Sequence, residues 1–240
     1  MPTCCIIIPC YNEANRLTAE PFINFVNTEP NYSLLFVNDG STDDTLTVLN
    51  SIKNKYPSRI HILNKNKNTG KAETIRAGML HTATKDNFSY LAFLDADLAT
   101  PINEIPLMVN ILEKSSLFKI VLGSRVKRLG AKIERSEIRH YIGRFFVTYT
   151  NLLLSIGAYD SQCGAKVFDT SQINKLFSEP FISNWFFDIE ILLRSNKNEI
   201  LEMPISSWYE VGGSKLKIID FITAPFEIIK IRKHYKSKNE

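Results

Sequence analysis

Apolar runs of six or seven residues alternate with longer amphipathic segments through the first half of the chain. The runs show no apolar–polar alternation, which is typical of strands that are buried on both faces. They occupy residues 4–10, 32–38, 59–64, 90–95 and 119–124. Helices are expected between them, at residues 14–28, from the 39–43 turn to about residue 56, at 70–84 and at about 103–115. This alternation predicts an α/β fold with a mostly parallel central sheet and helices on both faces.

The second half is less regular. A long helix is expected at residues 136–156, a strand at 165–169, a helix at 185–195 and a strand at 200–205. A terminal helix is expected at residues 219–236, kinked or restarted at Pro225. The simplest organisation is one domain over residues 1–218, with a C-terminal basic helix or tail over residues 219–240.

Composition and charge narrow the function classes. Of the 240 residues, 44% are hydrophobic and 22% are charged, which is an ordinary globular composition. A net charge of +4 is too small to indicate nucleic acid as a partner. The excess of Lys and Arg from Lys230 onward is typical either of a solvated basic tail or of a segment that contacts a membrane surface.

Cysteine usage and hydropathy bear on the compartment. Cys4, Cys5, Cys10 and Cys163 show no paired CxxC spacing, so a reducing, cytoplasmic compartment is expected, without disulfides or a zinc site. The first residues lack the basic segment of a signal peptide. The longest charge-free apolar stretch, at residues 145–159, has 15 residues. Because a transmembrane helix needs about 20, the chain is expected to lie on a membrane at most.

Polar residues follow the predicted strands, at the sheet edge where ligands of such folds bind. Asp95 and Asp97 come after the fourth strand with one residue between them, so their side chains point the same way. Adjacent carboxylates repel each other unless a cation bridges them. Mg²⁺ or Mn²⁺ is the natural bridge, because such sites combine one or two carboxylates with substrate phosphates. The alternative is that Asp97 only caps a turn.

The segment NTGKAET at residues 68–74 is not a P-loop. Lys65 stands where the motif needs its first glycine, and Ala72 stands where a serine or threonine would bind the metal. No GxGxxG follows the first strand, which also excludes a dinucleotide-binding motif. Lys71 beside a helix start can hold a phosphate, although such a lysine is also common on a solvated helix end.

Nine segments, taken together, resemble the inverting glycosyltransferases of family 2, which have the GT-A fold. The first five follow predicted strands: IIIPCYNEANRL, LLFVNDGSTDDT, NKNTGKAETIRAGM, FLDADLATP and VLGSR. The later four resemble the branch that contains dolichyl-phosphate glucosyltransferase and other polyprenyl-phosphate glycosyltransferases: RSEIRHYIGRFF, YDSQCGAKVF, NWFFDIEIL and EVGGSKLKI. The resemblance covers about residues 3–220.

The resemblance implies roles for particular residues. The nucleotide sugar would contact Pro9, Tyr11, Glu13, Asp39, Lys71, Asp95, Ala96, Asp97, Gln162 and Lys215. Asp95 and Asp97 would hold the metal, and Arg125, Arg135 and Arg139 would bind the acceptor phosphate. Asp97, Arg125, Asp188 and Glu190 are the candidate catalytic residues. The implied donor is a nucleotide sugar, with UDP-glucose as the first choice.

The acceptor decides whether a base is needed. A sugar hydroxyl must lose a proton, for which Asp188 or Glu190 is the candidate base. A phosphate monoester is already a dianion near neutral pH and needs only cations to position it. The arginines after the fifth strand favour a polyprenyl phosphate, although Arg128 and Arg144 are equally well explained as ordinary helix-surface residues. Retention of the fold by a non-enzymatic membrane scaffold is a third possibility.

Two segments offer apolar surface to a lipid. Apolar residues recur at near-helical spacing through residues 138–157, which fits either a core helix or an interfacial one. Residues 221–229 are largely apolar and precede the basic tail, as in helices that lie in a membrane interface. The protein is therefore expected to be cytoplasmic and peripheral at the cytoplasmic face of a membrane.

Overall fold

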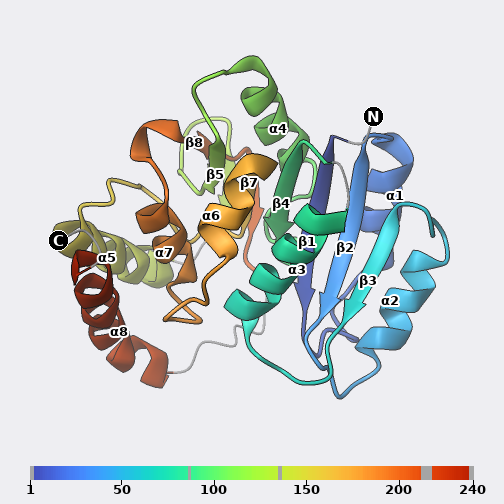
Figure 1. Ribbon diagram of the computed structural model, residues 1–240, viewed down its shortest axis with the longest axis horizontal. Helices are drawn as coiled ribbons and strands as arrows, with labels where there is room; N and C mark the ends of the chain where they lie inside the picture. The colour runs from blue at the N-terminus through green and yellow to red at the C-terminus, as the bar shows by residue number, and fades with distance from the viewer. Residues whose placement is uncertain (1–2, 86–87, 135–136, 212–217, 238–240) are drawn as a thin grey trace.

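The structure is a computed structural model that describes residues 3–85, 88–134, 137–211 and 218–237. Seven strands form one sheet in the order β3-β2-β1-β4-β7-β5-β8 (Figure 1). Neighbouring strands run parallel except for β7, which is antiparallel to both β4 and β5. The strands are β1 (Cys4–Cys10), β2 (Tyr32–Asn38), β3 (Ile60–Asn64), β4 (Tyr90–Leu94), β5 (Ile120–Ser124), β7 (Ala165–Asp169) and β8 (Ile200–Pro204).

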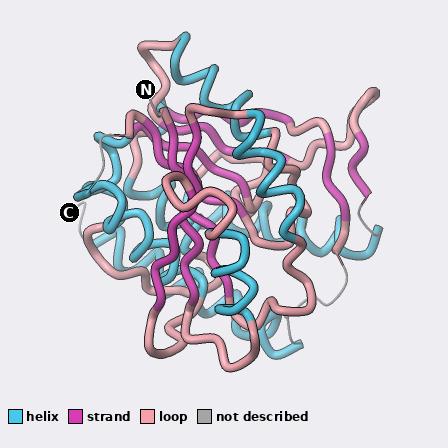
Figure 2. The backbone as a smooth tube through the Cα atoms, turned by 90° about the vertical axis from the view of Figure 1, so that its right-hand side faces the viewer, coloured by secondary structure: helices cyan, strands magenta, loops and turns pink. Residues whose placement is uncertain are grey.

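Helices lie on both faces of this sheet, which runs between them in the view turned by 90° (Figure 2). They are α1 (Ala19–Thr28), α2 (Thr45–Lys53), α3 (Lys71–Lys85), α4 (Glu104–Lys114), α5 (Glu137–Leu154), α6 (Ile173–Phe177), α7 (Phe187–Arg194) and α8 (Ile218–Ser237). Two short strands, β6 (Lys132–Glu134) and β9 (Ser207–Tyr209), pair in parallel outside the main sheet. The predicted α/β fold with a mostly parallel sheet is confirmed.

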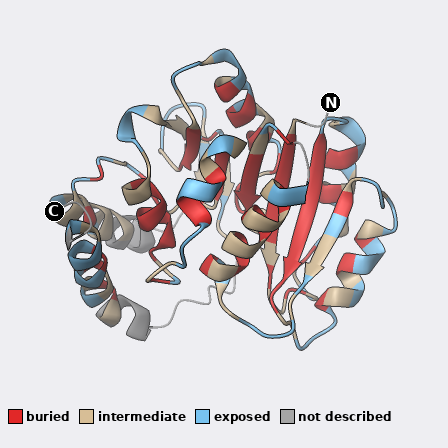
Figure 3. Ribbon diagram, in the orientation of Figure 1, coloured by how far each residue is buried: buried red, intermediate tan, exposed pale blue. Residues whose placement is uncertain are grey.

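Consecutive residues of the buried strands serve two different cores. In β1, Ile6 and Ile8 pack into the cluster that contains residues of α1, α2 and α4, whereas Cys5 and Ile7 pack into the cluster with α3, α6 and α7. Side chains alternate across a strand, so a strand between two helical layers must be apolar at every position. Figure 3 shows the central strands almost entirely buried. The unbroken apolar runs of the sequence follow from this arrangement.

Most predicted elements are confirmed to within a few residues, and the main errors lie at helix starts. The first helix begins at Ala19 and not at residue 14. Asn12 has a left-handed φ of 51°, and the carbonyl of Glu13 closes a turn by accepting from the amides of Arg16 and Leu17. This separate turn delays the helix.

The predicted bounds of the second helix are also wrong at both ends. It begins at Thr45, whose N–H donates to Asp43 Oδ1, and it ends at Lys53 and not near residue 56. The expected cap, Ser41 or Thr42, lies before the helix, where Ser41 is hydrogen-bonded to Asn38 and accepts from the amide of Asn12. Pro225 lies inside a continuous α8, so of the two predicted alternatives the restart is wrong and the kink stays a prediction.

The C-terminal helix packs against α5 and the core. Ala224, Ile228 and Ile231 are fully buried in the cluster that also holds residues of α3 and α7. None of the helices in the described ranges combines the length and the apolar character needed to cross a bilayer. The division of the chain at residue 218 stays a prediction.

Candidate active site

Asp95 follows β4 directly and is held against the segment before β7. Its N–H donates to the carbonyl of Gly164 at 3.1 Å. A side chain at position 164 would collide with the Asp95 carboxylate, so a glycine is needed for this close approach. Asp95 Oδ1 lies 2.5 Å from Nζ of Lys71, at the start of α3. The antiparallel strand β7 thus brings a late part of the chain to the first carboxylate.

Asp97 both caps a turn and faces a second cation. Its Oδ1 accepts from the amide of Ala99 at 3.1 Å, and its Oδ2 lies 3.6 Å from Nη2 of Arg16. Burial, and next the charge of Asp95, raise the pKa of Asp97 above its ordinary value. Leu98 has a left-handed φ of 51°, which is a strained conformation for leucine. The turn therefore holds two carboxylates together against their repulsion.

This donor set fits a hard divalent cation. Asp95 and Asp97 offer carboxylate oxygens, and each already lies beside a cationic side chain of the chain itself. Within the described ranges, no three His, Cys, Asp or Glu side chains form a metal cluster. Mg²⁺ typically uses one or two carboxylates and completes its coordination with phosphates and water. A pair of aspartates is therefore sufficient for a cation that arrives with a diphosphate.

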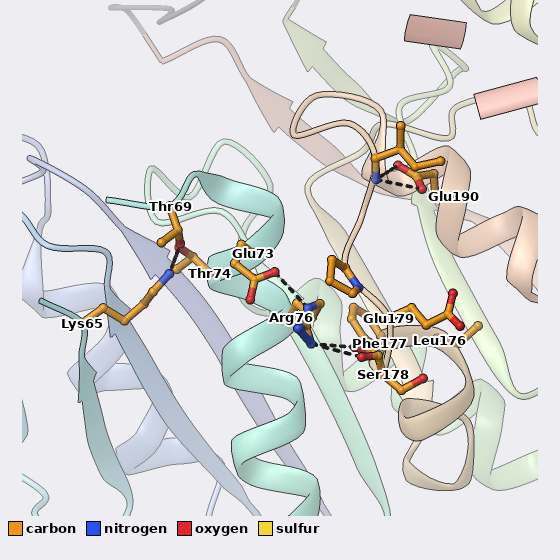
Figure 4. Close-up of polar contacts among 12 residues, drawn as sticks. Lys65, Thr69, Glu73, Thr74, Arg76, Leu176, Phe177, Ser178, Glu179 and Glu190 are labelled. Atoms are coloured by element: carbon orange, nitrogen blue, oxygen red, sulfur yellow. Dashed lines mark hydrogen bonds and ion pairs between the residues drawn. The ribbon is translucent and has the colours of Figure 1, made fainter. Parts of the chain in front are cut away.

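Asp39, after β2, shapes the loop that carries Lys71. The carboxylate accepts from Lys65 Nζ at 2.7 Å and from the amides of Thr69 and Gly70 at 3.0 and 2.9 Å. Burial opposes its ionisation, but hydrogen bonds from Lys65 and Thr69 hold the pKa of Asp39 below its usual range. Figure 4 shows Lys65 directed at Thr69. Asp39 thus fixes the residues that directly precede Lys71. It also lies at the sheet edge where the nucleotide is expected.

The remaining residues expected at the nucleotide lie around the first strand and the Asp95 turn. Pro9 and Tyr11 are half-buried at the end of β1, and Ala96 is buried between the two aspartates. Glu13 donates its N–H to Thr45 Oγ1 at 2.8 Å, and its Oε2 lies 3.1 Å from Nε of Arg16. Glu13 therefore reaches the Asp97 turn through this arginine.

Arg16 is the residue near the carboxylates that sequence reasoning missed. It lies between Glu13 and Asp97 and joins the segment after β1 to the turn after β4. The i,i+3 spacing from Glu13 was the only local signal, and it indicates an ion pair without indicating the second partner. The contact with Asp97 spans the sheet edge and depends on the fold.

Arg125, at the end of β5, is locked to Asp160. Its Nε and Nη2 donate to the two carboxylate oxygens at 2.7 and 2.8 Å, and its backbone N–H donates at 3.0 Å. Despite the cost of burial, Arg125 holds the pKa of Asp160 down at about 2. Gln162 lines a pocket together with Arg125 and Asp160, and it donates to the carbonyl of Trp185 at 3.5 Å. Asp160 is not among the predicted residues: it lies in the segment YDSQCGAKVF, but nothing in that segment indicates Arg125, 35 positions earlier, as its partner.

Asp188, near the start of α7, forms a buried ion pair. Its Oδ1 accepts from Nζ of Lys166 at 2.7 Å, and that ammonium group also donates to the carbonyl of Cys163. The Lys166 side chain is completely buried. Burial raises the pKa of Asp188, and Lys166 opposes the rise. The pair connects α7 to β7, two residues after Gly164, which contacts Asp95.

Glu190 is completely buried and holds backbone groups. Its carboxylate accepts from the amides of Ile182 and Ser183 at 2.9 Å and from the hydroxyl of Tyr235 at 3.1 Å. Arg194 lies 3.7 Å away and donates to Tyr235 at 2.7 Å. In Figure 4, Glu190 is drawn beside this backbone, away from Lys65 and Thr69. These contacts tie the loop before α7 to the C-terminal helix.

Three predicted residues lie at least partly outside the description. Arg135 and Lys215 fall outside the described residues, and Arg139 lies in α5 at a position whose side chain is not described. Their roles at phosphates stay predictions.

Comparison with known proteins is consistent with this geometry. The sequence profile described as glycosyl transferase family 2 matches residues 5–180. A dolichyl-phosphate beta-glucosyltransferase of Trichomonas vaginalis is 31% identical over 96% of this chain and 71% of its own length. The dolichyl-phosphate beta-glucosyltransferase of Saccharomyces cerevisiae is 31% identical over 96% of this chain and 74% of its own length.

Solved structures support the fold. Glucosyl-3-phosphoglycerate synthase from Mycobacterium tuberculosis, in complex with Mn²⁺, UDP and glucosyl-3-phosphoglycerate, has a TM-score of 0.69 at 14% identity, over 98% of this chain and 80% of that chain. Mannosyl-3-phosphoglycerate synthase from Rubrobacter xylanophilus has a TM-score of 0.71 at 12% identity, over 99% and 75%. The resemblance in sequence is thereby confirmed: the chain belongs to glycosyl transferase family 2 and is a nucleotide-sugar glycosyltransferase with the GT-A fold.

Proposed function

We propose that the protein transfers glucose from UDP-glucose to the phosphate of a polyprenyl or dolichyl phosphate, with inversion at the anomeric carbon. The names of its relatives support this acceptor and this sugar. The observation that carries the choice of acceptor is the state of the two candidate bases. Glu190 is buried among backbone donors, and Asp188 is paired with a buried lysine. Neither is arranged as a free base, and a phosphate acceptor needs none.

Residues of the chain would neutralise the leaving group at the Asp95–Asp97 turn. Asp95 and Asp97 would hold Mg²⁺ or Mn²⁺, and the chemistry that such an ion supplies is neutralisation of charge on the departing diphosphate. Lys71 and Arg16, which lie beside these carboxylates, would then turn toward the phosphates of the donor. Asp39 would keep Lys71 in place through its hold on Thr69 and Gly70.

Exposed apolar residues on two helices support the proposed peripheral contact with a membrane. Phe145 and Leu152 on α5 are 65% and 79% exposed, and Phe226 on α8 is 71% exposed. The same α8 is buried along Ala224, Ile228 and Ile231, so it has a core face as well as exposed apolar residues. Arg232, Lys233 and Lys236 lie on the last turns of α8. Apolar and basic residues on one helix are typical of interfacial binding, here expected at the cytoplasmic face of a membrane.

A panel of UDP- and GDP-sugars with Mn²⁺, measured by thermal shift and then by transfer, tests the proposal. UDP-glucose should stabilise the protein most, and transfer to polyprenyl phosphate should require the metal. Transfer to a saccharide hydroxyl, dependent on Asp188 or Glu190, would support the alternative family 2 activity in polysaccharide synthesis. Failure to bind any nucleotide would support the scaffold reading.

A further inference from the structure

A pocket beside Arg125 contains two arginines that come from different parts of the fold. It lies between the end of β5, the middle of α5 and the segment that precedes β7. Its polar lining residues are Arg125, Arg144, Tyr159, Asp160 and Gln162. Because Arg125 and Asp160 both lie here, the charge of the pocket depends on how each arginine is paired.

The charge of Arg125 is already neutralised. The Asp160 carboxylate accepts hydrogen bonds from two guanidinium nitrogens and the backbone N–H of Arg125, all within 3.0 Å. The side chains of the pair are only 14% and 9% exposed. The backbone at Asp160 is itself held in place, because the Glu202 carboxylate on β8 accepts hydrogen bonds from the N–H groups of Tyr159 and Asp160, both at 2.7 Å. A bidentate pair this well held presents little net charge to a ligand.

The charge of Arg144 is not neutralised in this way. Its Nη1 donates to the carbonyl of Tyr159 at 3.0 Å, and its guanidinium carbon lies 4.1 Å from the centre of the Tyr159 ring. Both contacts orient the guanidinium plane, but neither partner carries a formal charge. None of the ion pairs between residues that the structure describes involves Arg144. Among the described residues that line the pocket, Arg144 is therefore the cation that is not paired directly with a carboxylate.

The surroundings of Arg144 fit an amphiphilic anion. Phe145, its neighbour on α5, is 65% exposed, and Leu152 on the same helix is 79% exposed. A planar guanidinium suits a phosphate, and exposed apolar side chains suit the hydrocarbon attached to it. The diphosphate of a donor has its own cations, Lys71 and Arg16, at the Asp95–Asp97 turn.

We propose that Arg144 binds the phosphate of the lipid acceptor, because it is the cation among the described lining residues that is not paired with a carboxylate. The proposal rests on the proposed function, and it changes which residues are assigned to the acceptor phosphate. Arg144, which the sequence explains equally well as a surface residue, becomes a binding residue. Arg125 acts beside it with one nitrogen left for a ligand.

Arg144→Gln tests the proposal, with Arg59→Gln as a matched control. Arg59 makes the same kinds of contact away from the pocket: its Nη1 donates to the carbonyl of Glu29 at 3.1 Å, and its guanidinium lies 5.5 Å from the Tyr56 ring. With UDP-glucose and Mn²⁺, Arg144→Gln should raise the KM for polyprenyl phosphate about tenfold or more. The KM for UDP-glucose should not change, and Arg59→Gln should change neither value.

A second substitution covers the case in which Arg144→Gln does not fold. Val147 also lines the pocket, so Val147→Glu would place a carboxylate where it can pair with Arg144. The KM for polyprenyl phosphate should rise in Val147→Glu and not in Val147→Gln. An unchanged acceptor KM in a folded Arg144→Gln protein, or an equal rise in the KM for UDP-glucose, would overturn the proposal. The second result would make Arg144 a ligand of the donor diphosphate.

A binding measurement separates this proposal from the proposed function. Farnesyl phosphate is titrated calorimetrically into the UDP–Mn²⁺ complex of the full chain, with farnesol as the uncharged control. The wild-type protein should bind farnesyl phosphate about tenfold more tightly than Arg144→Gln does, and farnesol should bind both equally. This result would support the Arg144 site even if no glucose were transferred. Equal affinity of the two proteins for farnesyl phosphate would overturn it.

Discussion

The ammonium group of Lys71, at the start of α3, lies 2.5 Å from Oδ1 of Asp95, which follows β4. Although burial favours the neutral amine, the charges of Asp95 and Asp188 raise the pKa of Lys71. The lysine is therefore a permanent cation among three carboxylates, Asp97 being the third. A diphosphate entering this site meets a charge that the fold has already placed.

Lys71→Met is expected to weaken binding of the nucleotide sugar. The ammonium group would contact the donor phosphates in a partly dry site, and such charge-assisted contacts are worth about tenfold or more in affinity. Calorimetric titration with UDP in the presence of Mn²⁺ measures the loss. Lys55→Met, an exposed lysine after α2, is the control. Unchanged UDP affinity in Lys71→Met would show that Lys71 only balances Asp95.

Asp97→Asn is expected to impair the use of the metal. The amide keeps the shape of the side chain but removes the charge that attracts a hard cation. Transfer should fall about 100-fold, and the half-saturating Mn²⁺ concentration should rise. Asp44→Asn, an exposed aspartate at the start of α2, should behave like the wild-type protein. Full transfer by Asp97→Asn at low Mn²⁺ would contradict the metal site.

Glu190→Gln separates the two kinds of acceptor. The amide oxygen of glutamine can still accept from Ile182 and Ser183, as Oε1 does, but its NH2 group replaces Oε2 beside the Tyr235 hydroxyl and Arg194. Loss of these charge-assisted contacts should cost about 1–3 kcal/mol of folding free energy. Urea denaturation measures this loss, with the exposed Glu20→Gln as the control. The kcat of the folded variant should stay close to the wild-type value. A large fall in kcat with unchanged stability would favour Glu190 as a base and a hydroxyl acceptor.

Asp160→Asn is expected to remove a pH-dependent part of the stability. The pKa of Asp160 falls from its ordinary value of 3.8 to about 2 in the folded protein. A lowered carboxyl pKa stabilises the fold above the unfolded pKa, and this stabilisation is lost as the pH falls toward the folded value. The variant should be about 2 kcal/mol less stable at pH 7 by urea denaturation, and the difference should shrink between about pH 4 and 2. A difference that does not change with pH would exclude the Arg125–Asp160 charge pair as its cause.

The sequence predicts the sheet far better than its strand order. Runs such as residues 4–10 specify strands because every position is apolar, and β1 has those bounds. The insertion of β7, antiparallel between β4 and β5, depends on packing between distant segments that no local pattern encodes. Yet this insertion places Gly164 against Asp95, and with it much of the site.

The candidate site shows the same division. Asp95, Asp97 and Lys71 could be predicted because each is a charged residue close to a predicted strand end or helix start. Their partners could not: Arg16 reaches Asp97 across the sheet edge, and Asp160 reaches Arg125 over 35 positions of sequence. A charge pair between residues that are distant in sequence produces no local sequence pattern from which it could be predicted. The structure therefore changes which arginine is free to bind a phosphate more than it changes where the site lies.

Transfer from radiolabelled UDP-glucose to polyprenyl phosphate, with polyprenol of the same chain length as the competing acceptor, tests the central claim most directly. The two lipids differ only in the phosphate, so the comparison isolates the group that is proposed to attack. We expect a labelled glucosyl phospholipid of inverted, β configuration that forms only with Mg²⁺ or Mn²⁺ and only from the phosphorylated lipid. Label in polyprenol or in an added saccharide, or none in polyprenyl phosphate, would contradict it.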